Sequence, residues 1–211
     1  DLLKHCNFSE VKGNVNIDIE GVTYDSRRCG RNFAFFAFEG IHTDGNRYID
    51  AAADKGATAV FTSVLPAVLR ENVTYVQTDN PKKTMSALAS ALYDHPSSRL
   101  SVIGVTGTDG KSSSVFFLYQ MLNLLGRKTG FLSTVEYSDG ESIIKNPYRQ
   151  STPESSEIMM ILDEMVGKGL EMSILAQFFF YSALTLIPLS LPLAILLAAL
   201  MTFGNFGERF E

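Results

Sequence analysis

A glycine-rich stretch at residues 104–114, GVTGTDGKSSS, constrains the fold more than any other part of this sequence. It follows the short apolar run LSVI and precedes the longer apolar run VFFLYQMLNLL. This order predicts a strand, a tight loop and then a helix that starts near Ser112. The first turn of a helix has unpaired backbone N–H groups and a partial positive charge, and both favour an anion. We therefore expect a phosphate-binding loop.

The residue types in the loop suit a nucleotide with a magnesium ion. We expect Lys111 to act catalytically at the terminal phosphates and the Ser112 hydroxyl to serve as a metal ligand, with ATP and Mg²⁺ as the cofactors. The expected nucleotide contacts are Gly107, Thr108, Asp109, Gly110, Lys111, Ser112 and Ser113. The strict P-loop pattern is not met, because Val105 stands where that pattern has its first glycine. The alternative is a glycine- and serine-rich turn with a surface lysine.

The chain around this loop has an α/β pattern. Apolar strand-like runs alternate with helix-like segments from Val22 to about Val166, which predicts βαβ units and a mostly parallel sheet. HPSSR at 95–99 is the predicted linker between a small substrate domain, 1–98, and the start of a P-loop ATPase domain, 99–171. In the second part, Ile158, Ile161, Leu162 and Met165 recur at helical spacing and are expected to face the core.

Composition excludes several functional classes. The chain has 18 lysines and arginines against 23 acidic residues, without a basic stripe, so nucleic acid is not an expected partner. Two cysteines are too few for a disulfide framework and fit a reducing compartment. The N-terminus lacks the apolar core of a signal peptide, so a cytoplasmic location is expected.

Several segments in the same order resemble the Mur ligases, the ATP-dependent amide-forming enzymes of peptidoglycan synthesis. GVTGTDGKSSS is similar to the one-residue-longer loop GxTGTNGKTT of that family. The segments TYDSRR, FAFFAFEGIHTDGNRYIDAAADKGATAVF and QSTPESSEIMMILDEMVGKG resemble the branch that adds the third residue of the stem peptide. The resemblance covers about residues 20–170.

The resemblance implies a substrate, a reaction and a set of contacts. The substrates would be UDP-N-acetylmuramoyl-L-Ala-D-Glu and a diamino acid, whose identity the sequence does not specify. The implied reaction forms an acyl phosphate from the D-Glu carboxylate and ATP, which the amino group then attacks. The implied substrate contacts are Tyr24, Ser26, Ile41, His42, Thr43, Gln150, Ser151 and Thr152. Without the resemblance, His42 would be an exposed residue of a polar loop, and Ser151–Glu154 is also a plausible helix start.

The sequence departs from the family pattern at three places, of which the replacement of threonine by Ser112 in the loop is mild. Asp109 replaces the usual asparagine and adds a carboxylate near the phosphates. Gly30-Arg31-Asn32 replaces a Pro-Gly-Asp turn, which Asn32 can serve because asparagine tolerates a left-handed backbone. The sequence from Asp79 to Lys82, DNPK, is similar to a recognition motif of the family's third domain, and we interpret it as a helix start.

The tail at 172–211 differs from everything before it, since no charged residue occurs from Met172 to Gly207. The family's Glu-x-Ser-Ser-His segment, with its metal-binding glutamate, is expected near Ala176–Tyr181 and is not readable there. Three interpretations remain open. One is a reading-frame slip near residue 172, in which TCT serine codons are read as TTC phenylalanine. The others are a membrane segment, although Pro188 and Pro192 interrupt it, and a divergent core segment of the ATPase domain.

These observations predict the N-terminal part of a cytoplasmic peptidoglycan ligase, present as an inactive fragment. The alternative is a non-catalytic, membrane-attached nucleotide-binding module. A folylpolyglutamate synthetase would share the loop but lacks the DSR and STPE segments. A membrane is an expected partner only if the tail is native.

Overall fold

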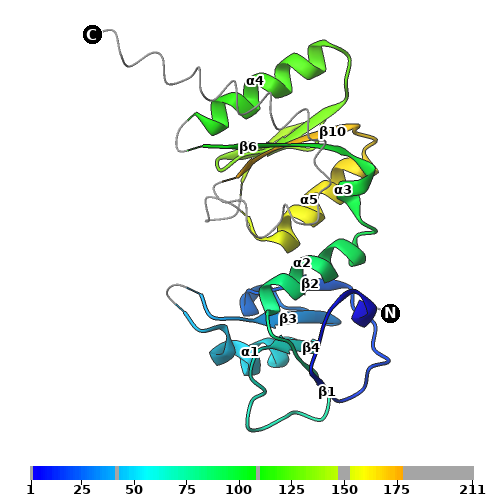
Figure 1. The fold of residues 1–211 in the computed structure, drawn as a ribbon, viewed down its shortest axis with the longest axis vertical. Coiled ribbons are helices and arrows are strands. Elements are labelled where there is room, and N and C mark those ends of the chain that lie inside the picture. Colours follow the sequence, from blue (N-terminus) through cyan, green and yellow to red (C-terminus); the bar gives the residue numbers. More distant parts are fainter. Residues whose placement is uncertain (1, 41–42, 108–109, 147–152, 178–211) are drawn as a thin grey trace, which may run out of the picture. The chain divides into compact units, whose positions relative to one another are not determined.

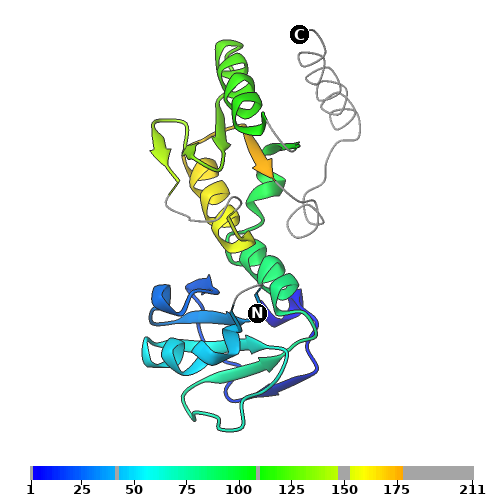
Figure 2. The same cartoon turned by 90° about the vertical axis from the view of Figure 1, so that its left-hand side faces the viewer.

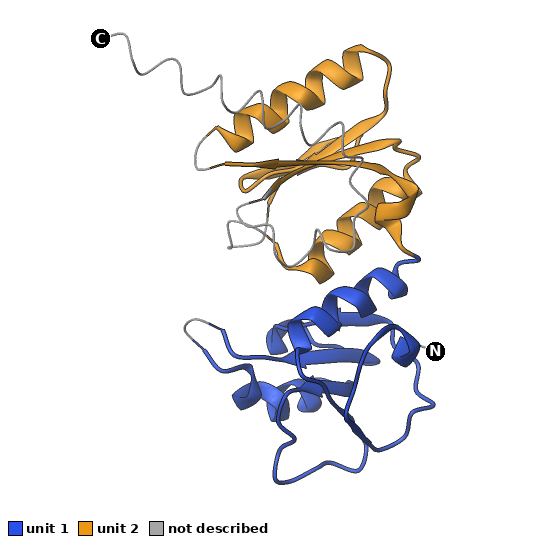
Figure 3. Cartoon of the chain, viewed as in Figure 1, with its two compact units in different colours: residues 1–94 blue, residues 95–211 orange. Residues whose placement is uncertain are grey.

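The computed structural model describes residues 2–40, 43–107, 110–146 and 153–177. The chain divides into two compact units, residues 1–94 and 95–211 (Figure 3). The division falls four residues before the domain boundary that the sequence predicts. Both units are α/β, as predicted.

Unit 1 is built on a five-stranded sheet in the order β1-β5-β4-β3-β2. All neighbouring strands are parallel except β1, which pairs antiparallel with β5. Its elements are η1 (Leu2–His5), β1 (Glu10–Lys12), β2 (Gly21–Thr23), η2 (Ser26–Arg28), β3 (Phe33–Ala37), η3 (Gly45–Tyr48), α1 (Ile49–Asp54), β4 (Ala57–Thr62), β5 (Thr74–Gln77) and α2 (Pro81–Leu92).

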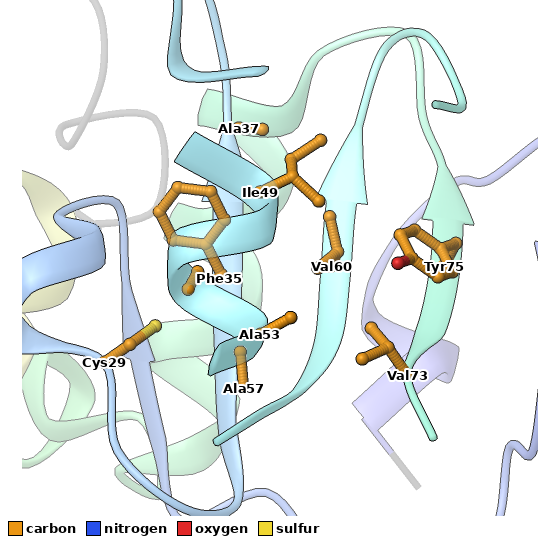
Figure 4. Close-up of a cluster of buried hydrophobic side chains, with 10 residues drawn as sticks. Cys29, Phe35, Ala37, Ile49, Ala53, Ala57, Val60, Val73 and Tyr75 are labelled. Atoms are coloured by element: carbon orange, nitrogen blue, oxygen red, sulfur yellow. The ribbon is translucent and has the colours of Figure 1, made fainter. Parts of the chain in front are cut away.

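Successive side chains of β3 alternate between the two faces of this sheet, as the pleat of a strand requires. Phe35 and Ala37 pack with Val60 and with α1 in one buried cluster (Figure 4). Phe36 stacks on Phe61 with ring centroids 4.6 Å apart. The continuous apolar run FAFFA is therefore a strand buried on both faces, which is typical of parallel sheets.

Two local predictions in unit 1 are confirmed. Asn32 has φ 62°, so asparagine does adopt the left-handed turn conformation that the sequence required. The DNPK segment is a helix start: the Asn80 side chain accepts a hydrogen bond from the Lys83 backbone N–H at 2.9 Å, and Pro81 occupies the first turn of α2. A cap followed by proline is a common helix beginning, because proline lacks the N–H that would be unpaired there.

Unit 2 contains a second five-stranded sheet, in the order β6-β10-β7-β8-β9. The strands β6, β10 and β7 are parallel, and β8 and β9 continue as an antiparallel hairpin. The elements are α3 (Pro96–Arg99), β6 (Ser101–Thr106), α4 (Lys111–Leu124), β7 (Thr129–Leu132), β8 (Glu136–Ser138), β9 (Ile143–Lys145), α5 (Ser155–Gly167) and β10 (Met172–Gln177).

Helices cover both faces of this sheet (Figures 1 and 2). On the α4 side, Val115 packs with Ile103, Val105, Phe131 and Ile174. On the α5 side, the four residues predicted to face the core, Ile158, Ile161, Leu162 and Met165, are all at most 2% exposed. The helical spacing therefore identified the buried face of α5 correctly.

The first six residues of the apolar tail belong to this sheet. Met172–Gln177 forms β10, which lies between β6 and β7 and pairs with both. Ser173, Ile174, Leu175 and Ala176 are buried. The sequence analysis placed the start of the tail at residue 172, but Met172–Gln177 still belongs to the α/β unit.

The predicted linker is ordered as a helix. Pro96–Arg99 forms the one-turn helix α3, and Pro96 and Ser97 are buried. A Pro-Ser-Ser composition is compatible both with a flexible segment and with a proline-initiated helical turn, and the second is found here.

A buried carboxylate joins the end of α5 to the β8–β9 hairpin. Asp139, which is 3% exposed, accepts backbone hydrogen bonds from Glu141 and Ser142, each at 3.0 Å. Its other oxygen accepts from the Lys168 ammonium at 2.5 Å. Although burial opposes ionisation, these donors lower the pKa of Asp139 from 3.8 to about 2.

We expect Asp139→Asn to destabilise the chain at neutral pH by about 1–2 kcal/mol, because it removes the charge that these donors stabilise. Since the folded-state pKa lies below the unfolded value, this stabilisation is present above about pH 4 and is lost as the pH falls toward 2. Urea denaturation of both proteins between pH 7 and pH 3 should therefore give stability curves that converge at low pH. Glu141→Gln, at an exposed partner of Lys168, is the control and should change stability by less than about 0.5 kcal/mol. Parallel curves for the wild type and Asp139→Asn would contradict this assignment.

We also expect Gly130→Ala in β7 to destabilise unit 2 by about 1–3 kcal/mol, because the core has no space for a methyl group there. A Cβ at Gly130 would lie 2.7 Å from the Ser138 carbonyl oxygen and 2.7 Å from a Leu170 methyl carbon. Gly167→Ala, at the end of α5, is the matched control, since nothing lies within 4 Å of its Cβ position. That substitution should be neutral or stabilising by up to about 1 kcal/mol. Equal unfolding midpoints for the two variants would disprove the packing argument.

Candidate functional site

The glycine-rich loop lies at the carboxyl end of β6, as predicted. The strand ends at Thr106, and α4 begins at Lys111 with Gly110 as its N-cap. Gly110 has φ 75°, a conformation that glycine adopts without steric cost. The loop therefore places the positive end of a 14-residue helix at the edge where parallel strands of an open α/β sheet bind ligands.

Lys111 is buried at this helix start. It is 5% exposed, and its Nζ donates a hydrogen bond to the Gly107 carbonyl oxygen at 2.6 Å. The alternative interpretation of a surface lysine is therefore wrong. A lysine ammonium held across its own glycine loop carries a full positive charge beside the helix N-terminus, and both attract phosphate.

A second loop reaches the same edge, and the sequence analysis missed it. Thr134 follows β7, and its Oγ1 lies 3.4 Å from Oγ of Ser112. The signal was present in the sequence, because Ser133-Thr134 follows the apolar run GFL directly. Nothing in the sequence alone indicated that β7 would end opposite the phosphate loop.

The residues at this edge fit a magnesium ion bound together with phosphates. Among the described residues no group of three or more His, Cys, Asp or Glu side chains could hold a metal by itself. Magnesium commonly takes only one or two protein oxygens and completes its shell with phosphate oxygens and water. The Ser112 hydroxyl is such an oxygen. The β10 strand ends at the same edge of the sheet as β6, with Gln177 opposite Thr106 in the parallel register.

In unit 1 the predicted substrate contacts follow the carboxyl ends of neighbouring strands. Tyr24 and Ser26 come after β2, and Thr43 comes after β3, which runs parallel to β2. The Asp25 carboxylate accepts hydrogen bonds from the backbone N–H and the guanidinium of Arg27, which lower the pKa of Asp25. This capping fixes the turn that carries Ser26, which is 9% exposed.

An aromatic pair with a lysine lies next to these residues and was not predicted. The Tyr24 ring stacks on Phe38, with centroids 6.0 Å apart, and the Lys82 ammonium lies 5.8 Å from the centre of the Phe38 ring. Thr43 is exposed, and its carbonyl oxygen accepts from the Gly40 N–H at 2.8 Å. This edge of unit 1 therefore offers an aromatic surface, hydroxyl groups and the Lys82 ammonium.

Several predicted contacts lie outside the described residues. They are Thr108, Asp109, Ile41, His42, Gln150, Ser151 and Thr152. The structure describes Gly107, Gly110, Lys111, Ser112 and Ser113 in unit 2, and it describes Tyr24, Ser26 and Thr43 in unit 1.

Comparison with known proteins identifies the family. Residues 18–95 match the family described as "Mur ligase family, catalytic domain". The chain is 46% identical over 178 residues to a UDP-N-acetylmuramyl-tripeptide synthetase of Borrelia garinii subsp. bavariensis, covering 83% of this chain and 34% of that protein. This chain contains a Mur ligase domain. The synthetase of Borreliella burgdorferi is 48% identical over 168 residues, covering 78% of this chain and 33% of that protein.

Solved structures agree with the Mur ligase fold. A UDP-N-acetylmuramoyl-L-alanyl-D-glutamate–2,6-diaminopimelate ligase superposes with a TM-score of 0.60 at 18% identity, covering 75% of this chain and 32% of that chain. A MurF ligase from Thermotoga maritima in complex with ADP superposes with a TM-score of 0.50 at 22% identity, covering 74% and 31%. The α/β prediction with a mostly parallel sheet is confirmed. This Mur ligase chain spans about a third of the length of the relatives it matches.

A second match concerns the C-terminal part. Residues 155–211 match the family described as "Lipopolysaccharide export system permease LptF/LptG". The first part of this range, up to residue 177, includes α5 and β10 of unit 2. Within the described residues, no helix is long and apolar enough to cross a membrane.

Proposed function

We propose that this chain is the front part of an ATP-dependent ligase that adds a diamino acid to UDP-N-acetylmuramoyl-L-Ala-D-Glu. Unit 1 would bind the UDP-sugar peptide and unit 2 would bind ATP. The buried Lys111 at the start of α4, behind a glycine loop in a Mur-like sheet, is the observation that carries the proposal. The names of the relatives support the same reaction.

In unit 2, each residue of the site would have a separate role. The N–H groups at the start of α4 would hold the phosphates, and Lys111 would neutralise charge on the transferred phosphoryl group. Ser112 would contribute one oxygen to a magnesium ion, which supplies further charge neutralisation when bound. Gln150, Ser151 and Thr152 would contact the muramoyl peptide.

In unit 1, Tyr24 and Ser26 would receive the uracil end of the substrate, together with Ile41, His42 and Thr43. An aromatic ring stacks on a nucleobase at little conformational cost, and the neighbouring Lys82 suits a diphosphate. We propose residues 1–98 as the substrate domain, 99–171 as the start of the ATPase domain, and a cytoplasmic location for this part. Without the family's glutamate, the chain would bind nucleotide but not turn it over.

We expect Lys111→Met to weaken ATP binding in Mg²⁺ by about 100-fold, because the variant keeps the buried stem but loses the charge at the phosphates. Isothermal titration calorimetry of the full chain measures this. Lys128→Met, at an exposed lysine of the same unit, is the control and should bind like the wild type. Equal affinity of the wild type and Lys111→Met would refute the nucleotide site.

A membrane-attached, non-catalytic nucleotide-binding module is the second candidate function. The permease match at 155–211 favours it, together with the charge-free sequence from Met172 to Gly207. The chain would then join part of a Mur ligase to a membrane segment.

If the tail is a membrane segment, the full chain should float with phospholipid vesicles in a density gradient, and a variant ending at Gln177 should not. The variant keeps β10, the exposed apolar residues Phe117 and Leu124 of α4, and the exposed Leu125 just after this helix, so it isolates the effect of residues 178–211. A full chain that sediments without lipid would contradict the membrane-attached module and favour the ligase proposal.

A further inference from the structure

The turn that carries Thr134 is held by its own serine. In this turn, which joins β7 to β8, the Ser133 N–H and Oγ both donate to the Glu136 carbonyl oxygen, at 2.9 Å and 2.7 Å. Its Oγ also accepts from the N–H groups of Val135 and Glu136, at 3.3 Å and 3.1 Å. A hydroxyl that bonds its own backbone in this way fixes the geometry of a turn.

Asn146 holds the same turn from outside. It follows β9, and its backbone N–H donates to the Val135 carbonyl oxygen at 2.8 Å. Its side-chain amide donates to the Ser133 carbonyl oxygen at 2.9 Å. The two acceptors flank Thr134 in the sequence, so Asn146 restrains the backbone on both sides of this threonine. Asn146 is 9% exposed, and a buried hydrogen bond of this kind is costly to leave unmade.

The contact that this turn makes with the phosphate loop is weak by itself. The 3.4 Å separation of the Thr134 and Ser112 hydroxyl oxygens is well above the ~2.8 Å typical of hydroxyl hydrogen bonds. The hydroxyl contact therefore does not hold the turn. Instead, the turn, tied down by Ser133 and Asn146, determines where the Thr134 hydroxyl stands beside Ser112.

We propose that Asn146 is a positioning residue of the nucleotide site, acting through Thr134 on Ser112. This inference rests on the proposed function, because its predicted effect is a change in ATP affinity in the presence of magnesium. The two Asn146 hydrogen bonds described above both end on the turn, at the carbonyl oxygens of Ser133 and Val135. The influence of Asn146 passes through the backbone of the turn to one hydroxyl, and from there to the first turn of α4.

The first test is a set of variants measured by calorimetry with ATP, in Mg²⁺ and in EDTA. We expect Asn146→Ala to weaken ATP binding about tenfold in Mg²⁺, because it loses the side-chain hydrogen bond to the Ser133 carbonyl oxygen that orients the Thr134 turn. We expect Thr134→Val to do the same, because it removes the hydroxyl itself. Thr134→Ser should restore the affinity. The Asn146→Ala/Thr134→Val double variant should bind no more weakly than Thr134→Val alone, since the two residues act along one path.

Asn123→Ala is the matched control. The Asn123 amide donates to the Thr129 carbonyl oxygen at 3.2 Å, and its oxygen accepts from the Thr129 N–H at 3.3 Å, so it ties the other end of β7 to α4. This variant also loses side-chain hydrogen bonds to the backbone, but at the opposite end of the strand from Thr134. It should lower the unfolding midpoint without changing ATP affinity by more than about twofold. If Asn146→Ala also binds ATP like the wild type while folded, or if its effect adds to that of Thr134→Val, the proposal is wrong.

A second readout separates this inference from the proposed function. Backbone amide resonances of Gly110, Lys111 and Ser112 should shift in Asn146→Ala and in Thr134→Val, but not in Asn123→Ala. If the wild type fails to bind ATP, the proposed function fails, and these resonances alone decide the inference. Unchanged resonances at Ser112 in Asn146→Ala would overturn it.

Discussion

The parallel pairing of β10 between β6 and β7 is the constraint on which unit 2 depends. Register pairs Ala176 with Val105 and Leu175 with both Gly104 and Leu132, so the three strands end at one edge. Because every strand of a parallel set points the same way, the loops that follow β6 and β7 must meet there. The phosphate loop and the Thr134 turn are neighbours for this reason, although 20 or more residues separate them in the chain.

Charge at this edge is arranged by burial and by backbone geometry. Lys111 is nearly enclosed and bonded to its own loop, which favours an anion over water as its further partner. The Asp139–Lys168 ion pair has a structural role, since it joins the end of α5 to the β8–β9 hairpin. A buried ion pair can serve stability in one place, while in the proposed nucleotide site a buried cation at a helix start would serve binding.

The two family matches overlap along the chain. The Mur ligase similarity covers most of the chain, and the permease similarity begins at residue 155, inside the Mur-like unit. Met172–Gln177 lies inside the permease match and is free of charge, and it forms a central strand of the sheet. Apolar composition is shared by central parallel strands and membrane segments, so composition alone did not distinguish where one ends and the other begins.

The sequence by itself determined the local elements and the chemistry of the loop. The run FAFFA, the helical stripe of α5 and the Asn80-Pro81 helix start can each be recognised from a pattern of residues close in the chain, and the structure has them as predicted. Strand order, the burial of Lys111 and the meeting of Thr134 with Ser112 were decided only by the tertiary structure. The strand order depends on β10, which begins at Met172, far along the chain from the phosphate loop, and no local pattern specifies which strands it will join.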